Sequence, residues 1–222
     1  FCAHHRDDYP AGNDQLGVES VALQGRNVGS DFVLRDGFRM YHGTEVPGFP
    51  KHPHRGFETI TLARHGLIDH SDSMGARARF GSGDVQWMTA GRGVVHCEMF
   101  PLVHRDKRNP AELFQIWLNL PAKDKMVPPY FTMFWADQMP VVNVVDHAGR
   151  KTQVLTIVGA LGERTPDPPP DSWASKTDHR VQVWRIAMEA GAQWTLPKAT
   201  EGDGRVSYVY ESGGLEIAEH AI

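Results

Sequence analysis

Two short motifs, each placing strong metal-binding side chains two residues apart, constrain this chain most. The first is His52-Pro53-His54, and the second is His96-Cys97-Glu98. Residues i and i+2 of a β-strand point to the same face, so each motif predicts a strand that aims two donors at one point. Two such strands facing a common interior bring together three imidazoles and one carboxylate. This donor set favours a divalent transition metal over Ca²⁺ or Mg²⁺, which prefer oxygen ligands.

A single His-x-His motif is weak evidence for a metal, because chance and surface histidines supply many. Here the two motifs lie about 40 residues apart with Gly-rich turns between them. The alternative is a loop pair at His52 and His54 and a surface pair at His96 and Glu98. The apolar neighbours in the second motif, Val94, Val95 and Met99, indicate instead that its polar side chains point into an enclosed space. A metal is one partner that offsets the desolvation of such a buried pair.

The rest of the chain predicts an all-β protein. Its 222 residues include 22 Gly and 15 Pro, which separate short runs of apolar and β-branched residues. No amphipathic helix of four turns is evident, and four prolines in 165–173 exclude regular structure there. The expected strands are residues 38–41, 56–68, 85–88, 94–100, 112–120, 130–135, 152–160, 181–188, 193–196 and 206–210.

Composition excludes several classes of function. The net charge is −4 and no run of Lys or Arg stands out, so direct nucleic-acid binding is not expected. No apolar run is long enough to cross a membrane, and no signal peptide is evident. Two cysteines make no disulfide framework, which favours a reducing compartment. We therefore expect a cytoplasmic location, or also a nuclear one in a eukaryote, and the start at Phe1 indicates that the natural protein begins upstream.

Other polar side chains near the motifs have a less direct role in this interpretation. Glu58 completes a His-x-His-x-x-x-Glu pattern, and in a regular strand it would share a face with His52 and His54. We expect it to support the ligands rather than bind the metal, because four donors are already present. Cys97 alternates away from the site and is expected in the core.

Several residues have a simpler structural explanation. The cluster 4–8 (HHRDD) is expected in a solvated N-terminal arm rather than in a second metal site. His65 and His70 flank a turn and are expected to be solvated, whereas Trp87 and Met88 are typical core residues. No Gly-x-Ser-x-Gly elbow or triad order indicates a hydrolase.

The motif residues also carry a resemblance to a known family. The segment HPHRGFET at 52–59, followed by GDVQWMTAGRGVVHCEM at 83–99, resembles the pirin family, as does FQIWLNLPAKDKMVPPYF at 114–131. The similarity covers about residues 47–135. Pirins are cupins with two jelly-roll β-barrels in tandem, the first of which holds iron. By motif, the resemblance implies that His52, His54, His96 and Glu98 are the metal ligands.

The resemblance suggests a division into three parts: an N-terminal arm at 1–31, a metal-binding cupin domain at 32–140 and a partial cupin-like domain at 141–222. A jelly roll needs about eight strands, and about half that number is expected after Arg150. Either the chain is truncated or its second barrel is reduced. The second half lacks matching ligand motifs, so it is expected to be free of metal.

Some pirins resemble quercetin 2,3-dioxygenases, and this resemblance implies a first function. Fe(II) (Fe²⁺) held by the four ligands would act on a flavonol and O₂, and Glu98 would double as the catalytic base. The expected pocket residues are Phe57, Trp87, Met88 and Phe114. Mn, Co, Ni, Cu and Zn suit the same donors, so the sequence does not fix the metal.

Two other functions remain open at this stage. Other pirins are thought to be iron-dependent, redox-sensitive transcriptional co-regulators, which implies a transcription factor as protein partner and no turnover. A structural metal, most simply zinc in a closed tetrahedral site, is the third alternative. Turnover separates the first function from the second, and redox activity of the metal separates the third from both.

Overall fold

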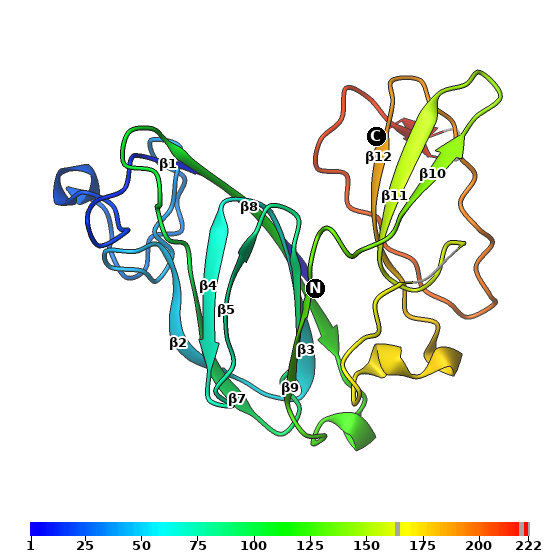
Figure 1. The fold of residues 1–222 in the computed structure, drawn as a ribbon, viewed down its shortest axis with the longest axis horizontal. Coiled ribbons are helices and arrows are strands. Elements are labelled where there is room, and N and C mark those ends of the chain that lie inside the picture. The colour runs from blue at the N-terminus through cyan, green and yellow to red at the C-terminus, as the bar shows by residue number, and fades with distance from the viewer. Residues whose placement is uncertain (163–164, 218–219, 222) are drawn as a thin grey trace.

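The computed structural model describes residues 1–162, 165–217 and 220–221, which form an all-β fold (Figure 1). Nine antiparallel strands make two sheets, with orders β1-β8-β3-β6-β9 and β2-β7-β4-β5. The two sheets face each other as a cupin jelly-roll barrel. Their bounds are β1 (Cys2–Tyr9), β2 (Gly48–His54), β3 (Phe57–His65), β4 (Leu67–Asp72), β5 (Arg77–Gly81), β6 (Val85–Thr89), β7 (Val94–Met99), β8 (Asn109–Asn119) and β9 (Tyr130–Phe134).

Alternation along β3 gives the five-stranded sheet two different faces. Thr59 and Thr61 point into the barrel, whereas Ile60 and Leu62 belong to a core on the outer face. In β7, the buried residues are Val94, His96 and Glu98, with the residues between them only half-buried. The interior of the barrel is therefore lined in part by polar groups, and it is here that the candidate site forms.

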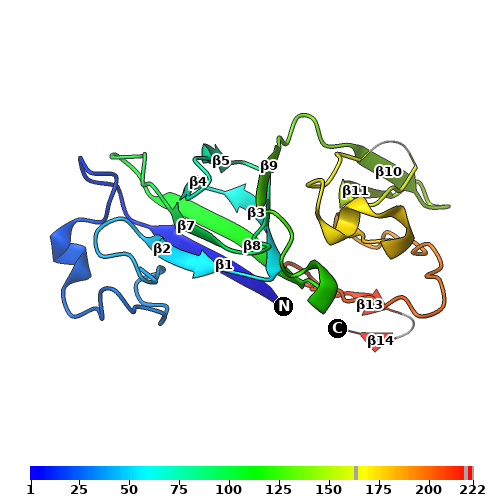
Figure 2. The same ribbon diagram turned by 90° about the horizontal axis from the view of Figure 1, so that it is seen from below.

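A second unit packs on the outer face of the five-stranded sheet, beside the barrel in both views (Figures 1 and 2). It contains the antiparallel sheet β10-β11-β12 and a two-stranded antiparallel sheet, β13-β14. Leu155 and Val158 from this unit share an apolar core with Trp87, Phe114 and Phe134 of the barrel. The strands of this second unit are β10 (Val141–Val145), β11 (Lys151–Val158), β12 (Val183–Met188), β13 (Glu216–Ile217) and β14 (His220–Ala221).

Helical structure in the described residues is limited to four single 3₁₀ turns: η1 (Ser20–Leu23), η2 (Ala122–Asp124), η3 (Trp173–Ser175) and η4 (Thr177–His179). None of these turns has the length and hydrophobicity that a membrane crossing requires.

The structure corrects several sequence-based expectations. Part of the expected N-terminal arm is β1, which pairs with β8 along its whole length. Residues 38–41, 193–196 and 206–210 were expected to be strands and are not. Six strands were not expected: β1, β4, β5, β10, β13 and β14. The boundaries at residues 31/32 and 140/141 remain predictions.

Candidate metal centre

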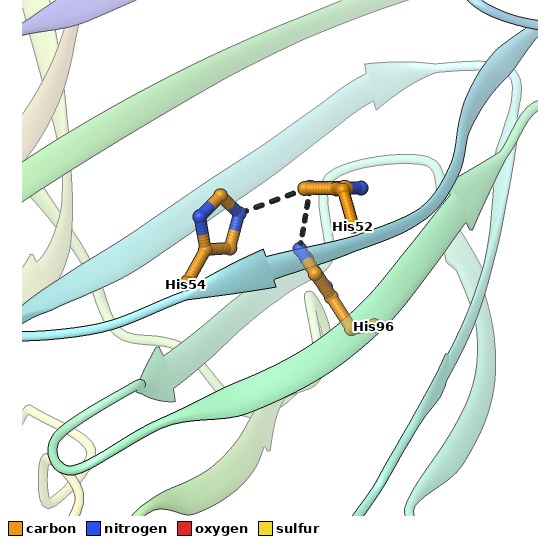
Figure 3. Close-up of side chains that lie close together, drawn as sticks. All are labelled: His52, His54 and His96. Atoms are coloured by element: carbon orange, nitrogen blue, oxygen red, sulfur yellow. Dashed lines mark hydrogen bonds between the residues drawn. The ribbon is translucent and has the colours of Figure 1, made fainter.

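Three histidine side chains converge on one point of the barrel wall (Figure 3). In the antiparallel pairing of β2 with β7, His52 lies opposite His96, and an irregularity in the pairing between Phe49 and His52 sets this register. The Nε2 atom of His52 lies 3.0 Å from Nε2 of His54 and 3.0 Å from Nε2 of His96. The strands therefore bring the three predicted imidazole ligands together.

The hydrogen bonding of His52 shows which of its ring nitrogens is protonated and which has a lone pair. Its Nδ1 lies 2.7 Å from the carbonyl oxygen of Pro50, which accepts but cannot donate. Nδ1 therefore carries the proton, and Nε2 presents a lone pair toward His54 and His96. Imidazole nitrogens converging around such a lone pair match the requirements of a divalent transition metal. The three imidazoles thus fit the divalent transition metal that the donor set predicts.

Glu98 lies deeper in the barrel than the half-buried His52 and His54, with 2% of its surface exposed. Its Oε1 accepts a hydrogen bond from Thr61 Oγ1 at 3.2 Å, and its Oε2 accepts one from Gln115 Nε2 at 2.7 Å. Both donors come from the opposite sheet. Its carboxylate forms a second compact group with His70 and His96, within 4.8 Å of one another. His96 belongs to both groups and so connects Glu98 with the three-histidine cluster.

Burial sets the ionisation of these groups. Burial, followed by the neighbouring His52, His54 and His70, lowers the pKa of His96 to about 2. Burial and His52 lower the pKa of His54 to about 4. Both imidazoles are thus neutral near pH 7, the form that binds metal. Burial raises the pKa of Glu98 to about 7, against the lowering effect of its two hydrogen bonds.

An open cavity of about 440 Å³ leads to this cluster. This volume lies within the range of small-molecule sites. Aromatic rings of Phe49 and Trp117 form part of its wall, next to the polar groups of Glu98 and Gln115. The lining residues are His42, Phe49, Pro50, Lys51, His52, His54, Glu98, Gln115 and Trp117.

The expected pocket residues are mostly elsewhere. Trp87 and Phe114 belong to the apolar core on the outer face of the sheet, and Met88 is buried against Ala90 and Val94. The expectation that Trp87 and Met88 are core residues is confirmed. Only Phe57 lies beside the site, with its ring centroid 4.9 Å from that of His54.

Glu58 does not support the metal ligands. It is buried on the outer face of β3, where it accepts hydrogen bonds from Trp87 Nε1, Thr89 Oγ1 and the backbone N–H of Trp173. Gly56, with φ +77°, lies between β2 and β3 and breaks the alternation on which the prediction depended. The spacing from His54 to Glu58 therefore carries no information about a shared face.

His70 and Cys97 also differ from expectation. His70 is 3% exposed rather than solvated, and its Nδ1 lies 3.4 Å from Nδ1 of His96. Cys97 does point away from the site, but it is half-exposed on the outer surface, 3.2 Å from Ser71 Oγ, and not in the core. His65 is solvated as expected, with 60% of its side chain exposed.

Sequence reasoning also missed unpaired polar groups inside the barrel. The side-chain amide of Gln86 and the hydroxyl of Thr59 are buried, and neither finds a hydrogen-bond partner among the described residues. Gln86 lies opposite Thr61 in the pairing of β6 with β3. Buried polar groups without partners are rare in proteins, so the interior retains hydrogen-bonding capacity for water or a ligand.

Comparison with known proteins agrees with the resemblance seen in the motifs. The family profile described as Pirin matches residues 15–118, which include His52, His54, His96 and Glu98. Residues 15–118 form a pirin-family domain. Within this match lie β2 to β7 and nearly all of β8, so the family segment forms the wall that holds the three histidines.

Two curated relatives and one solved structure show how far the similarity extends. A Pseudomonas aeruginosa protein named "Putative quercetin 2,3-dioxygenase" is 41% identical over 67% of this chain and 49% of its own length. A pirin-like protein of Solanum lycopersicum is 34% identical over 72% of this chain and 64% of its own length. The crystal structure of an Acinetobacter baumannii quercetin 2,3-dioxygenase is 38% identical, with a TM-score of 0.48, over 55% of this chain and 41% of that one. The chain thus spans about half to two thirds of the length of these curated relatives.

Proposed function

We propose that this pirin-family protein is a metal-dependent oxidoreductase of the quercetin 2,3-dioxygenase type, acting on a flavonol and O₂. The observation that carries the proposal is the convergence of His52, His54 and His96 at a cavity that Glu98 also lines. The name of the Pseudomonas aeruginosa relative supports the reaction class.

His52, His54, His96 and Glu98 would hold the metal, with Fe(II) as the preferred ion. When bound, a redox-active ion supplies a Lewis acid and an electron path between an aromatic substrate and O₂. The half-buried position of His52 and His54 leaves the cluster accessible from the cavity. A closed structural site, in which protein ligands fill every position, would not need this access.

The cavity walls would bind and orient a planar aromatic substrate. Trp117 lies with its ring centroid 4.8 Å from that of Phe57, and its indole Nε1–H donates to Gln115 Oε1 at 3.2 Å. Gln115 in turn donates to Glu98, so the aromatic wall and the carboxylate are held together. An apolar ring wall of this kind excludes water from the face of a bound flavonol.

Glu98 would accept the proton of a substrate hydroxyl at a carboxylate oxygen. A general base must lie within reach of the proton that it accepts, and Glu98 lines the cavity in which the substrate would bind. Thr61 and Gln115 would hold the carboxylate in place from the opposite sheet while the proton moves.

Flavonol turnover tests the proposal. The protein is loaded anaerobically with Fe(II) and mixed with quercetin and air, and the loss of visible absorbance and release of carbon monoxide are followed. His96→Ala is expected to abolish turnover because it removes a ligand, whereas His65→Ala, at an exposed histidine, is expected to match the wild type. Stoichiometric metal binding without flavonol consumption would contradict the proposal and favour a co-regulator that acts through a protein partner.

A further inference from the structure

A second pair of buried side chains lies directly behind His96. In the antiparallel pairing of β4 with β7, His70 lies opposite Glu98 and Asp72 lies opposite His96. The side chains of His70 and Asp72 are both 0% exposed. His70 Nδ1 lies 3.4 Å from His96 Nδ1, and His70 Nε2 lies 3.0 Å from Asp72 Oδ2. The three side chains form a continuous line that ends at the metal-facing edge of His96.

We propose that Asp72 and His70 are positioning residues that hold the proton of His96 on Nδ1 and so leave its Nε2 free to bind the metal. The inference rests on the metal site of the proposed function, but it does not depend on flavonol chemistry. Metal-binding histidines commonly donate their second ring nitrogen to a carboxylate or carbonyl, which fixes the tautomer. Here a second imidazole lies between the ligand and the carboxylate.

The direction of each hydrogen bond follows from the group at the end of the line. An ionised carboxylate only accepts, so His70 Nε2 must carry a proton and donate it to Asp72. Neutral His70 then has a lone pair on Nδ1, which accepts from Nδ1–H of His96. His96 is left with its lone pair on Nε2, the atom that lies 3.0 Å from Nε2 of His52.

Asp72 is itself fixed by the turn between β4 and β5. Its Oδ1 accepts hydrogen bonds from the backbone N–H groups of Met74 at 2.8 Å and Ala76 at 3.0 Å. This leaves Oδ2 as the oxygen that faces His70. The ring of His70 also stacks on Phe131 of the other sheet, with centroids 4.6 Å apart. Both members are thus held by contacts other than the line itself.

His70 is placed behind the ligand cluster rather than within it. Its Nδ1 faces Nδ1 of His96, whereas His52 contacts the opposite edge of the ring at Nε2. Its other nitrogen is already used by Asp72. The compact group of His70, His96 and Glu98 is therefore explained without placing a second metal there.

The substitution Asp72→Asn tests this line of hydrogen bonds from Asp72 through His70 to His96, which we call the relay. The side-chain oxygen of Asn can still accept from Met74 and Ala76, but its NH₂ group donates toward His70. His70 Nε2 must then accept, its Nδ1–H must donate, and His96 must carry its proton on Nε2. Asp69→Asn is the matched control, because Asp69 lies on the same strand, exposed and paired with Arg79.

Two measurements report the result. Long-range ¹H–¹⁵N NMR of the metal-free protein gives the tautomer of each imidazole, with His96→Gln used for assignment. Competition titration gives the affinity for Co(II). We expect Nδ1–H at His96 in the wild type and in Asp69→Asn, and Nε2–H in Asp72→Asn. We also expect Asp72→Asn to weaken Co(II) binding by about 10- to 100-fold.

The wild-type spectrum alone can overturn the relay, if His96 carries its proton on Nε2, so the test does not depend on a variant that folds. Loss of Co(II) affinity in Asp72→Asn with an unchanged tautomer would overturn it too, because Asp72 would then act through packing. Flavonol turnover affects neither measurement, so the proposed enzyme activity and the relay can fail separately.

Discussion

At the scale of single residues, Glu58 makes the stability of the folded protein depend on pH. Burial raises its pKa to about 7, although hydrogen bonds from Trp87, Thr89 and the backbone of Trp173 oppose the shift. The carboxyl group lies where the barrel meets the second unit. Its ionisation is thus coupled to the contact between the two parts of the chain.

The folded protein should lose stability as Glu58 ionises. Its pKa in the folded state lies above the ordinary value of 4.5, so its favourable contribution is complete below pH 4.5 and is lost as the pH rises toward 7. The full effect is on the order of 3 kcal/mol, from 1.36 kcal/mol per pKa unit. Glu58→Gln, which cannot ionise, should flatten the pH dependence of urea unfolding between pH 4.5 and 8. Parallel pH profiles for Glu58→Gln and the wild type would contradict this, with the exposed Glu19→Gln as control.

At the scale of elements, Gly48 allows the start of β2 to lie close to the backbone of β7. Its φ is +126°, and a Cβ at this position would lie 2.5 Å from the carbonyl oxygen of Glu98. Only glycine fits both conditions. The strand that presents His52 and His54 thus depends on a residue without a side chain.

Gly48→Ala should destabilise the fold by about 1–3 kcal/mol, the cost of holding a non-glycine residue in a strained conformation. Because the clash is with the backbone of Glu98, the substitution should also weaken metal binding. Thermal unfolding and Co(II) titration measure the two effects. Gly204→Ala is the control, since a Cβ at Gly204 meets nothing within 4 Å. Equal behaviour of the two variants would show that the close approach of β2 to β7 is unimportant.

The strands that the sequence predicts are those with clear apolar alternation. In β7, Val94 and Met99 mark an apolar strand, and the i, i+2 rule then places His96 and Glu98 on one buried face. β4 has the same spacing in His70 and Asp72, but its sequence DHSD resembles a turn and conceals the strand. The i, i+2 rule also predicts β4 when it is applied to every pair of polar residues. β1 is concealed for a related reason, because its buried positions include the polar Asp7.

At the scale of the whole molecule, the second unit completes the burial of the five-stranded sheet. Leu155, 8% exposed, belongs to one apolar core with Trp87 and Phe134. A sequence cannot readily show which face of a sheet a distant segment covers, since both faces of β3 carry β-prone residues. This is why Trp87 and Phe114 were expected in the pocket and instead lie under the second unit.

Leu155→Ala should therefore destabilise the barrel as well as the unit that carries the residue. Truncation of a buried Leu costs about 2–5 kcal/mol. Urea unfolding followed by tryptophan fluorescence is expected to show an earlier transition that includes Trp87. Val145→Ala, at a 56% exposed position of β10, should leave it unchanged. An unchanged barrel transition in Leu155→Ala would show that the two parts unfold independently.

We predict that His52, His54 and His96 together hold one metal ion, and the metal content of the protein tests this prediction. The protein is equilibrated with Co(II), separated from free ion, and analysed for metal content and for the visible absorption of the bound ion. We predict one tightly bound ion per chain, lost in the double variant His52→Ala/His96→Ala and retained in His65→Ala. Equal Co(II) content in the wild type and the double variant, or no tight binding in the wild type, would show that these histidines do not form a metal centre.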